Sequence, residues 1–559
     1  MSKNLSALSG RKGLEQGLFE QLGKLGETDG TPDPEQLEQL AQSFLIGTAN
    51  TYGAATFYDF LRPENKGKQV YICNGSACLN AGTQSDVREQ LSRVFPPESI
   101  GEMCCLGRCH ENSAFHYAGS NYSGDAIENI ESIVRGGSEV ADHYRVTSIG
   151  QAILTQTDFP LEACTTAIQQ VLQSNPENLL ADIQRSGLRG RGGAGFPIGQ
   201  KLAFCRQAAG DPKFIICNAD EGDPGAYSDR YLLEHQPLRL LLGMLIAGYV
   251  TGAEWGVLYI RAEYPEAIRR VDQAIKDFYH SGLAGDKMLE SGFGFRFKTI
   301  HARGAYICGE ETALINSIEG QRPEVRVRPP YPAQSGLFGK PTVVNNVETL
   351  AALPTILLQG GSYYASIGTP ASPGTKLLSL DGHFQKPGIY EVEMGTPLEA
   401  VINDAGGFRI PVKALHIGGP LGGLVPAQKF RTLTIDFESF AQAGFLLGHA
   451  SILAIPATMP LINYLADLFR FAAHESCGKC FPCRLGTKRA EELFTRAATG
   501  EQQIDPVLLD DLLFTLESGS LCAHGGGIPL PVRNAIQYFR QELEPFFKSE
   551  TNYSDVSHS

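Results

Sequence analysis

The sequence predicts a multidomain α/β protein. The chain has 559 residues, and at roughly 100–200 residues per domain this length allows about three to five domains. Strand-like and helix-like segments alternate over residues 69–140 and 161–355, as in proteins built on α/β sheets, whereas residues 457–547 have a mainly helical pattern. Hydrophobic residues make up 42% and charged residues 19% of the chain, which is the composition of a folded globular protein.

The N-terminal region, residues 1–140, combines helices with a small cysteine-bearing unit. Residues 1–45 have apolar side chains at three- and four-residue spacing, which predicts helices. From Gln69 the pattern changes to a strand, QVYIC, then a loop with cysteines, then a helix, SDVREQLSRVF. Cysteines at strand ends in such an alternation suggest a thioredoxin-like unit. Residues 141–160 are expected to be a linker.

Three further regions follow. Residues 161–355 are expected to form a larger α/β domain, with strands KFIICNA and WGVLYIRA, helices PLRLLLGMLIAGYV and PEAIRRVDQAIKDFY, and an extended surface segment, RPEVRVRPPYPAQ. Residues 356–456 contain a compact β-rich unit with the segments TKLLSLDG, GIYEVEMG and ALHIGGP. A helical domain over residues 457–547 and a polar tail over residues 548–559 complete the chain.

Charge and hydropathy exclude two classes of partner. The formal net charge is −14, and an acidic surface argues against a nucleic-acid partner. The apolar stretch from Leu240 to Ala253 is shorter than the roughly 20 residues that span a bilayer. The segment MSKNLSALSGRKGLEQ lacks the apolar core of a signal peptide. We therefore expect a cytoplasmic protein that does not insert into a membrane.

The 13 cysteines indicate metal or redox chemistry. Their number is odd and the chain shows no export signal, so disulfide bonding is not the expected use. Most of them gather in two groups, one between residues 73 and 109 and the other between residues 477 and 522.

The C-terminal group has the spacing of a 4Fe–4S site. Cys477, Cys480 and Cys483 form C-x2-C-x2-C in ESCGKCFPC, and Cys522 follows in GSLCAHGG. Three close thiolates and one remote thiolate give each iron of a cubane one ligand. A four-thiolate zinc site is the alternative, but zinc ribbons usually pair two separate C-x2-C motifs, so the spacing favours the iron–sulfur cluster.

The N-terminal group has the spacing of a 2Fe–2S site. Cys73 and Cys78 form C-x4-C, and Cys105 and Cys109 form C-x3-C in CCLGRCH. Two ligands per iron suit this cluster, and zinc is again the alternative. Spacing alone favours Cys105 over the adjacent Cys104. A Rieske-type role for the histidine that follows Cys109 lacks a second histidine at matching spacing.

A glycine-rich loop, RGRGGAGFPIG, spans residues 189–199. Gly190, Gly192 and Gly195 match G-x-G-x-x-G formally, but the preceding NLLADIQRSG is predicted to be a helix, whereas a dinucleotide-binding fold needs a strand there. The P-loop ending G-K-[ST] is absent. Small residues beside basic side chains can still let backbone amides reach a phosphate or a ring.

Three polar segments support a binding function for this loop. They are NADEGDPGAYSDR at 218–230, GAYICGEETALINS at 304–317 and GKPTVVNNVET at 339–349. Their amides and carboxylates suit the edges of a flavin and ribose hydroxyls. Each segment alone has a simpler interpretation, because Asp and Asn clusters commonly cap helices.

Together, these motifs resemble the flavoprotein subunit of respiratory NADH dehydrogenase and its soluble relatives, including the beta subunit of NAD-dependent formate dehydrogenase and the diaphorase subunit of NAD-linked hydrogenase. The resemblance covers residues 161–547. Residues 1–140 resemble the thioredoxin-like 2Fe–2S subunit of the same systems, and TYGAATFYDF at 51–60 matches its pre-cluster segment, although the stretch between Cys78 and Cys105 is shorter than usual. The β-rich unit resembles the family's ubiquitin-like β-grasp domain.

The resemblance implies that NADH passes a hydride to FMN, which releases electrons singly to the 4Fe–4S cluster. No catalytic acid or base is then needed, because the cofactor performs the chemistry. By this match the residues that hold FMN are Gly190, Gly192, Gly193, Lys201, Asn218, Asp220, Glu221, Gly309, Glu310, Asn345, Asn346 and Thr349. Those on the NAD side are Phe196, Phe204, Asp223, Tyr306, Glu311 and Tyr331.

The family resemblance also implies redox partners. The motif details favour the diaphorase subunit of a formate dehydrogenase, so the expected partners are its catalytic and iron–sulfur subunits. A hydrogenase or a respiratory-type NADH dehydrogenase is the alternative. A further alternative is a non-catalytic iron–sulfur scaffold that has lost flavin, which the intact FMN segments disfavour.

Overall fold

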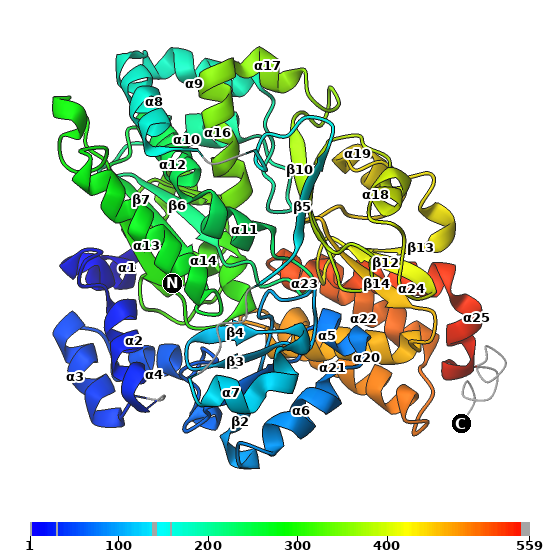
Figure 1. The fold of residues 1–559 in the computed structure, drawn as a ribbon. Helices are drawn as coiled ribbons and strands as arrows, with labels where there is room; N and C mark the ends of the chain where they lie inside the picture. Colours follow the sequence, from blue (N-terminus) through cyan, green and yellow to red (C-terminus); the bar gives the residue numbers. More distant parts are fainter. Residues whose placement is uncertain (1–2, 30–31, 137–141, 157–158, 549–559) are drawn as a thin grey trace, which may run out of the picture.

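The structure is a computed structural model of the 559-residue chain, and it describes all residues except 1–2, 30–31, 137–141, 157–158 and 549–559. Nearly all of the expected polar tail therefore lies outside the described residues. In Figure 1 the blue N-terminal region lies below the green α/β region, and the red C-terminal helices lie below the yellow β-rich region.

The N-terminal region has the predicted helices and the predicted thioredoxin-like unit. Its sheet has the order β2-β1-β3-β4, with β1 and β2 parallel and the other pairs antiparallel. The strands are β1 Val70–Cys73, β2 Ile100–Met103, β3 Phe115–Tyr117 and β4 Ser120–Tyr122. The helices are α1 Lys3–Ser9, α2 Leu18–Asp29, α3 Pro34–Phe44, α4 Thr48–Ala55, α5 Ser76–Ala81, α6 Gln84–Ser92 and α7 Ile130–Val134.

The central α/β region is built on a parallel sheet of order β8-β7-β6-β9. Its strands are β6 Phe214–Ala219, β7 Trp255–Ile260, β8 Arg296–His301 and β9 Thr342–Asn346. The helices are α8 Leu161–Gln173, α9 Pro176–Arg185, α10 Ile198–Gln207, α11 Ser228–His235, α12 Pro237–Thr251, α13 Pro265–His280, α14 Glu311–Ile318, α15 Pro332–Ser335, α16 Val347–Gln359 and α17 Gly361–Ala365. Helix α16 continues past residue 355, where we expected the domain to end.

Both faces of this sheet are covered, as its nearly continuous apolar strands require. Ile215 and Cys217 of β6 pack in one cluster with the buried helices α12 and α16, whereas Ile216 packs in another with α14. The second cluster also contains Phe19 and Tyr58 of the N-terminal region, and the Tyr58 hydroxyl donates to Ser317 Oγ over 2.8 Å. The N-terminal helices are thus part of the core of the α/β region.

The β-rich region forms a six-stranded sheet of order β13-β12-β14-β10-β11-β5. Its strands are β5 Arg145–Ile149, β10 Thr375–Leu380, β11 Gly388–Glu393, β12 Val412–Ile417, β13 Gly423–Pro426 and β14 Ser451–Pro456, with helices α18 Leu398–Asp404 and α19 Phe437–Gln442. Strand β5 lies inside the segment 141–160, which we expected to be a linker. Its sequence RVTSI is rich in β-branched residues and pairs in parallel with β11.

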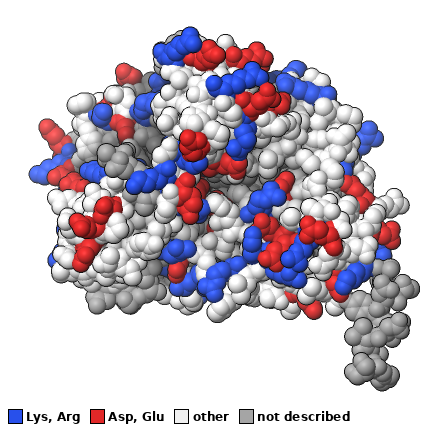
Figure 2. Space-filling view, turned by 90° about the horizontal axis from the view of Figure 1, so that it is seen from below, with Lys and Arg blue, Asp and Glu red and all other residues white. Residues whose placement is uncertain are grey.

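The C-terminal region is helical, as predicted. It comprises α20 Leu461–His474, α21 Phe481–Ala498, α22 Pro506–Gly519, α23 Ala523–Gly527, α24 Pro529–Tyr538 and α25 Arg540–Leu543. No helix in the described ranges is long and apolar enough to cross a bilayer. On the face of the molecule in Figure 2, acidic and basic side chains are interspersed in small groups.

Candidate functional site

A cavity of about 720 Å³ lies at the carboxyl ends of β6 and β9. Asn218 of β6 and Asn345 and Asn346 of β9 line it, because parallel strands end at the same edge of a sheet and ligands bind there. The cavity brings together eleven of the residues predicted to bind cofactor. They are Gly190, Gly192, Phe196, Lys201, Phe204, Asn218, Glu311, Tyr331, Asn345, Asn346 and Thr349.

The glycine-rich loop forms one wall of this cavity. It runs from α9 to α10, so a helix precedes it, as predicted, and it is closed by a hydrogen bond from Gly190 N to Phe196 O of 2.8 Å. The Cβ of any larger residue at 192 would lie 3.0 Å from Asn346 Cβ. Thr349 Oγ1 accepts a hydrogen bond from Arg191 N over 2.8 Å, so Thr349 fixes the loop.

Glu311 organises the charges of the cavity. Its carboxylate accepts from Lys201 Nζ and from Arg328 Nη1, each over 2.9 Å, and Lys201 Nζ also donates to Val344 O over 2.7 Å. Lys201 is therefore neutralised by Glu311 in this structure. Arg328, which sequence reasoning missed, comes from the proline-rich segment that we expected to be an extended surface.

Three aromatic side chains lie exposed at the mouth of the cavity. Phe196 is 46% exposed, Phe204 52% and Tyr331 55%. Large exposed aromatic rings are costly to hydrate and offer flat surfaces on which another ring can stack. This is the arrangement expected of the side that receives a nucleotide.

A smaller cavity of about 220 Å³ adjoins the first and shares Gly192, Asn218 and Asn346 with it. It brings together the remaining predicted residues except Gly193, namely Asp220, Glu221, Asp223, Tyr306, Gly309 and Glu310. Gly193 lines neither cavity; a Cβ there would lie 3.7 Å from Gly448, in the β-rich region.

Buried polar atoms without partners make this pair of cavities fit for a polar ring such as FMN. Asp220 Oδ2 and Asn345 Nδ2 have no hydrogen-bond partner among the described residues, and an unsatisfied buried group normally has a ligand or water. Burial raises the pKa of Asp220 well above its usual value. The helix-capping interpretation also holds, because Glu310 caps α14 and Asn346 caps α16.

The C-terminal cysteines meet at the starts of two helices. Cys480 precedes α21, Cys483 lies in its first turn, and Cys522 precedes α23. Cys477, Cys480 and Cys483 lie close enough for their charges to interact, as do Cys522 and Cys483. Burial raises the pKa of Cys483 to about 11 and that of Cys522 to about 12. Thiols that are protonated unless a metal is present suit a cluster site.

This cysteine site borders the smaller cavity. Ala523 and His524, which follow Cys522, line that cavity together with Tyr306. The rings of Tyr306 and His524 are 5.7 Å apart. An electron leaving the cavity would thus have a short path to Cys522.

The N-terminal cysteines also converge. Cys105 Sγ lies 3.3 Å from Cys109 Sγ, and Cys73 is within hydrogen-bonding reach of both Cys78 and Cys105. The geometry thus favours Cys105 over Cys104. His110 Nε2 is 2.6 Å from Asp142 Oδ1, so this nitrogen is engaged in a hydrogen bond with the carboxylate.

The N-terminal cysteine site is joined to the segment 218–230, which lines the smaller cavity. Gly225 N donates to Cys109 Sγ over 3.2 Å, and Arg230 Nη1 donates to Gly107 O over 2.7 Å. Tyr264 Oη donates to Glu221 Oε2 over 3.1 Å and lies against Gly107. Both iron–sulfur sites therefore contact segments that line the smaller cavity.

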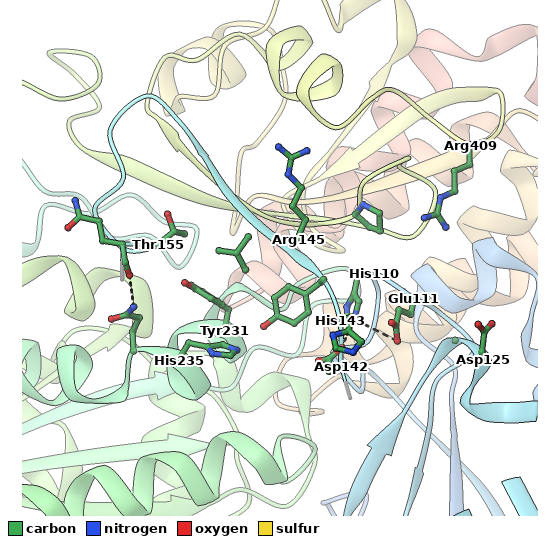
Figure 3. A pocket seen from close by; sticks show the side chains of 16 residues that line it. His110, Glu111, Asp125, Asp142, His143, Arg145, Thr155, Tyr231, His235 and Arg409 are labelled. Carbon is green, nitrogen blue, oxygen red and sulfur yellow. Dashed lines mark hydrogen bonds and ion pairs between the residues drawn. The ribbon is translucent and has the colours of Figure 1, made fainter. Parts of the chain in front are cut away.

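A third cavity of about 920 Å³ lies between the N-terminal region, α11 and the β-rich sheet. Figure 3 shows His110, Glu111, His143 and Asp142 close together in it, with Arg409 further away. Arg108, Arg230 and His110 all contact the Asp142 carboxylate. Because Arg108 and Arg230 already neutralise Asp142, the cluster has the features of a buried ion-pair network. The cavity contains none of the residues predicted to bind cofactor.

Two further residues of the smaller cavity, Asp229 and His449, were missed. Asp229 lies in the segment 218–230, from which we selected Asn218, Asp220, Glu221 and Asp223. His449 is the one histidine in a run, residues 439 to 466, that contains no Asp, Glu, Lys or Arg. A single histidine in such a run could have been singled out from the sequence as a candidate site residue.

Family models match most of the chain. They are the thioredoxin-like [2Fe-2S] ferredoxin over residues 7–137, the Nuo51 FMN-binding domain over 183–355, the SLBB domain over 379–424 and the NADH-ubiquinone oxidoreductase-F iron-sulfur binding region over 463–545. These matches confirm the predicted fold class and the predicted cofactors.

Individual relatives agree with these family matches. The chain is 41% identical to the F 2 subunit of NADH-quinone oxidoreductase from Rhizobium meliloti (strain 1021), over 66% of this chain and 88% of that protein. It is 41% identical to the HndC subunit of the NADP-reducing hydrogenase from Solidesulfovibrio fructosivorans, over 67% and 77%. A chain in the crystal structure of an NAD+-reducing [NiFe]-hydrogenase in the H2-reduced state superposes with a TM-score of 0.84 at 29% identity, over 94% of this chain and 92% of that chain.

Proposed function

The chain belongs to the family of NADH-dependent flavoprotein subunits of NADH-quinone oxidoreductases, and we propose that it is the NADH/NAD+ diaphorase subunit of a formate dehydrogenase. It is an NADH-dependent FMN and iron–sulfur oxidoreductase subunit with 4Fe–4S and 2Fe–2S sites. The proposed transfer of electrons from NADH through FMN to the clusters is supported by the pair of adjoining cavities. One cavity has aromatic side chains at its mouth, and the other is lined by Ala523 and His524, which follow Cys522.

FMN, when bound, exchanges a hydride with the nicotinamide and single electrons with the clusters. In the proposed site, Gly190 and Gly192 allow close approach, and Asn218, Asn345 and Asn346 supply amide groups to the cofactor. Phe196, Phe204 and Tyr331 stack on the nucleotide at the mouth. Asp223 and Tyr306 shape the inner wall on the nicotinamide side. No side chain is required to act as a proton donor or acceptor.

The proposed ligands of the 4Fe–4S cluster are Cys477, Cys480, Cys483 and Cys522, and those of the 2Fe–2S cluster are Cys73, Cys78, Cys105 and Cys109. The adjacency of Cys522 to the smaller cavity supports the first cluster as the exit for electrons. Gly225 holds Cys109, a proposed ligand of the second cluster, against the segment 218–230, which supports exchange of electrons between that cluster and FMN as well.

The proposed contact with the next redox subunit is the surface around Cys480. Phe481 is 68% and Leu485 59% exposed, and their i,i+4 spacing on α21 places them side by side. The guanidinium of Arg484 lies 4.8 Å from the Phe481 ring centre. An apolar centre beside an exposed cation suits a partner with an acidic rim around its own cluster.

Formate dehydrogenase is proposed because ESCGKCFPCRLGTKR, GSLCAHGG and TGAEWGVLYIRAEYP resemble its beta subunits. A hydrogenase is the second candidate. It is favoured because the chain of the NAD+-reducing [NiFe]-hydrogenase structure superposes on nearly the whole of this chain, including the fused N-terminal region. The segments SIGTPASPGTKLL and KPGIYEVEMG also resemble hydrogenase diaphorases.

The test is to purify the native complex anaerobically and assay NAD+ reduction with formate and with hydrogen. Reduction with formate alone is expected. Reduction with hydrogen would assign the second candidate, and reduction with neither would indicate a respiratory-type partner. Release of FMN on denaturation tests the diaphorase itself: a protein with both clusters and no FMN would be a scaffold.

A further inference from the structure

The β-rich region reaches into the smaller cavity with two loops. One contains Gly418 and Gly419, and a Cβ on Gly419 would lie 2.6 Å from the Asp223 carboxyl. The other contains Gly448 and His449 and lies against both Gly418 and Gly193. This region is therefore more than a spacer between domains, because it forms part of the wall of the cavity.

His449 is the ionisable side chain that this region contributes to the cavity wall. It is 8% exposed, and its Nε2 lies 3.3 Å from Asp229 Oδ2 and 3.6 Å from Glu221 Oε1. Burial lowers the pKa of His449, but the carboxylates of Asp229 and Glu221 outweigh that effect and raise it to about 9. Burial also raises the pKa of Glu221, to about 7, so Asp229, the nearer carboxylate, is the main partner that keeps the imidazole charged at neutral pH.

The two carboxylates around His449 are fixed by other groups. Asn346 Nδ2 donates to Asp229 Oδ2 over 2.6 Å. Glu221 accepts from the backbone amides of Asp229 and Arg230 over 2.9 and 3.0 Å. The positive charge is therefore held at one place, at a short distance from the asparagines that the proposed function assigns to FMN.

One ring nitrogen of His449, Nδ1, makes no hydrogen bond to any residue that the structure describes. Both ring nitrogens of a charged imidazole are donors, so Nδ1 carries an N–H. Asp220 Oδ2, in the same cavity, has no hydrogen-bond partner among the described residues either. A buried N–H left without a partner is unfavourable unless a ligand accepts its hydrogen bond.

We propose that His449 binds FMN through its free N–H and that its positive charge stabilises reduced FMN, the more negative form, over oxidised FMN. This inference rests on the proposed function, since it requires FMN in these cavities. It assigns to the β-rich region a direct part in setting the flavin potential.

The proposal is tested with His449→Gln, which keeps a hydrogen-bonding group and removes the charge, and with His449→Lys, which restores a charge. The full-length holoprotein is reconstituted with FMN, and the FMN midpoint potential is measured by spectroelectrochemical titration. His449→Gln is expected to lose about tenfold in preference for reduced over oxidised FMN, equivalent to about 30 mV for a two-electron couple. His449→Lys is expected to recover part of that loss.

His416→Gln is the matched control, because His416 is a buried histidine of the same β-rich region that hydrogen-bonds Tyr464 and does not line the cavity. It is expected to leave the FMN potential unchanged. EPR signals of both clusters report whether each variant is folded. If FMN is lost while both signals persist, its dissociation constant is measured by fluorescence, and weaker binding to His449→Gln than to the control supports the proposal.

Three results would overturn the inference. They are an unchanged potential in His449→Gln, an equal shift in His416→Gln, and loss of both cluster signals in every His449 variant, which would assign a purely structural role. Failure of the proposed function is distinguishable, because the unmodified protein would then bind no FMN at all.

Discussion

The backbone amide of Gly225 donates a hydrogen bond to Cys109 Sγ across 3.2 Å, and this contact joins the segment 218–230 to a proposed ligand of the N-terminal iron–sulfur cluster. An amide that donates to a thiolate stabilises the more negative, reduced cluster, so such bonds raise its potential. The two redox sites are thus linked by the backbone itself, which no side-chain motif in the sequence specifies.

Gly225→Ala is expected to lower the 2Fe–2S potential. Gly225 has a φ of +99°, and a Cβ there would lie 2.7 Å from Leu453 Cδ2, so the loop must move and lengthen the hydrogen bond. Loss of about 1 kcal/mol corresponds to about 40 mV for a one-electron couple. EPR-monitored redox titration measures this shift. Gly252→Ala, also at positive φ but facing open space, controls for backbone strain; an equal shift there would contradict the explanation.

Cys522→Ser is expected to abolish the 4Fe–4S EPR signal while NADH still bleaches FMN. Cys522 precedes α23, whose Ala523 and His524 line the smaller cavity, so we expect Cys522→Ser to remove the cluster without removing the nucleotide-binding wall. Anaerobic stopped-flow absorbance follows the bleaching, and EPR follows the cluster. Cys164→Ser, a buried thiol of α8 outside both groups, should keep both properties. A persistent 4Fe–4S signal in Cys522→Ser would refute the ligand assignment.

Phe204→Ala is expected to raise KM for NADH by about tenfold or more, with a smaller change in kcat. An aromatic ring stacked on a base contributes about 1–3 kcal/mol, and Phe204 lines the mouth of the larger cavity. Steady-state reduction of an artificial acceptor measures both constants. Tyr52→Ala removes an exposed aromatic ring on α4, which lies outside this cavity, and should have no effect. The stacking role fails if both variants behave alike.

Arg484→Glu is expected to slow electron transfer to the partner subunit several-fold without affecting NADH oxidation by an artificial acceptor. The substitution places a negative charge beside Phe481 on the proposed docking surface, where complementary charge governs association. The measurement is the rate of partner reduction at low and high salt, since screening should diminish the difference. Arg431→Glu, on an exposed arginine paired with Glu399, is the charge-matched control. Equal rates for the two variants would place the docking surface elsewhere.

The sequence predicted those parts of the site that short motifs encode. The C-x2-C-x2-C spacing and the loop around Gly192 are local patterns, and the structure brings the residues of each pattern together. His449 and Arg328 were missed because their roles depend on packing between segments far apart in the chain. Strand β5 was missed for the same reason: its partner β11 lies more than 200 residues away, and only the folded sheet brings them together.

Asp142→Asn is expected to destabilise the attachment of the N-terminal region. Burial favours the neutral acid, but Arg230, His110 and Arg108 outweigh it and hold the pKa of Asp142 well below its usual value. The contribution to stability is therefore fully present at neutral pH. It begins to decline near pH 4, where the unfolded carboxyl becomes protonated, and it is lost progressively as the pH falls towards the depressed pKa of the folded state.

At neutral pH the substitution leaves Arg108 and Arg230, 7% and 2% exposed, without their shared carboxylate. Breaking a buried pair in this way costs about 3–5 kcal/mol, so we expect a lower Tm in calorimetry together with a broadened 2Fe–2S EPR signal. Asp125→Asn, an exposed carboxylate of the same cavity, should shift Tm little. A Tm difference between the two variants that did not shrink as the pH was lowered from about 4 would show that the effect does not arise from the charge of Asp142.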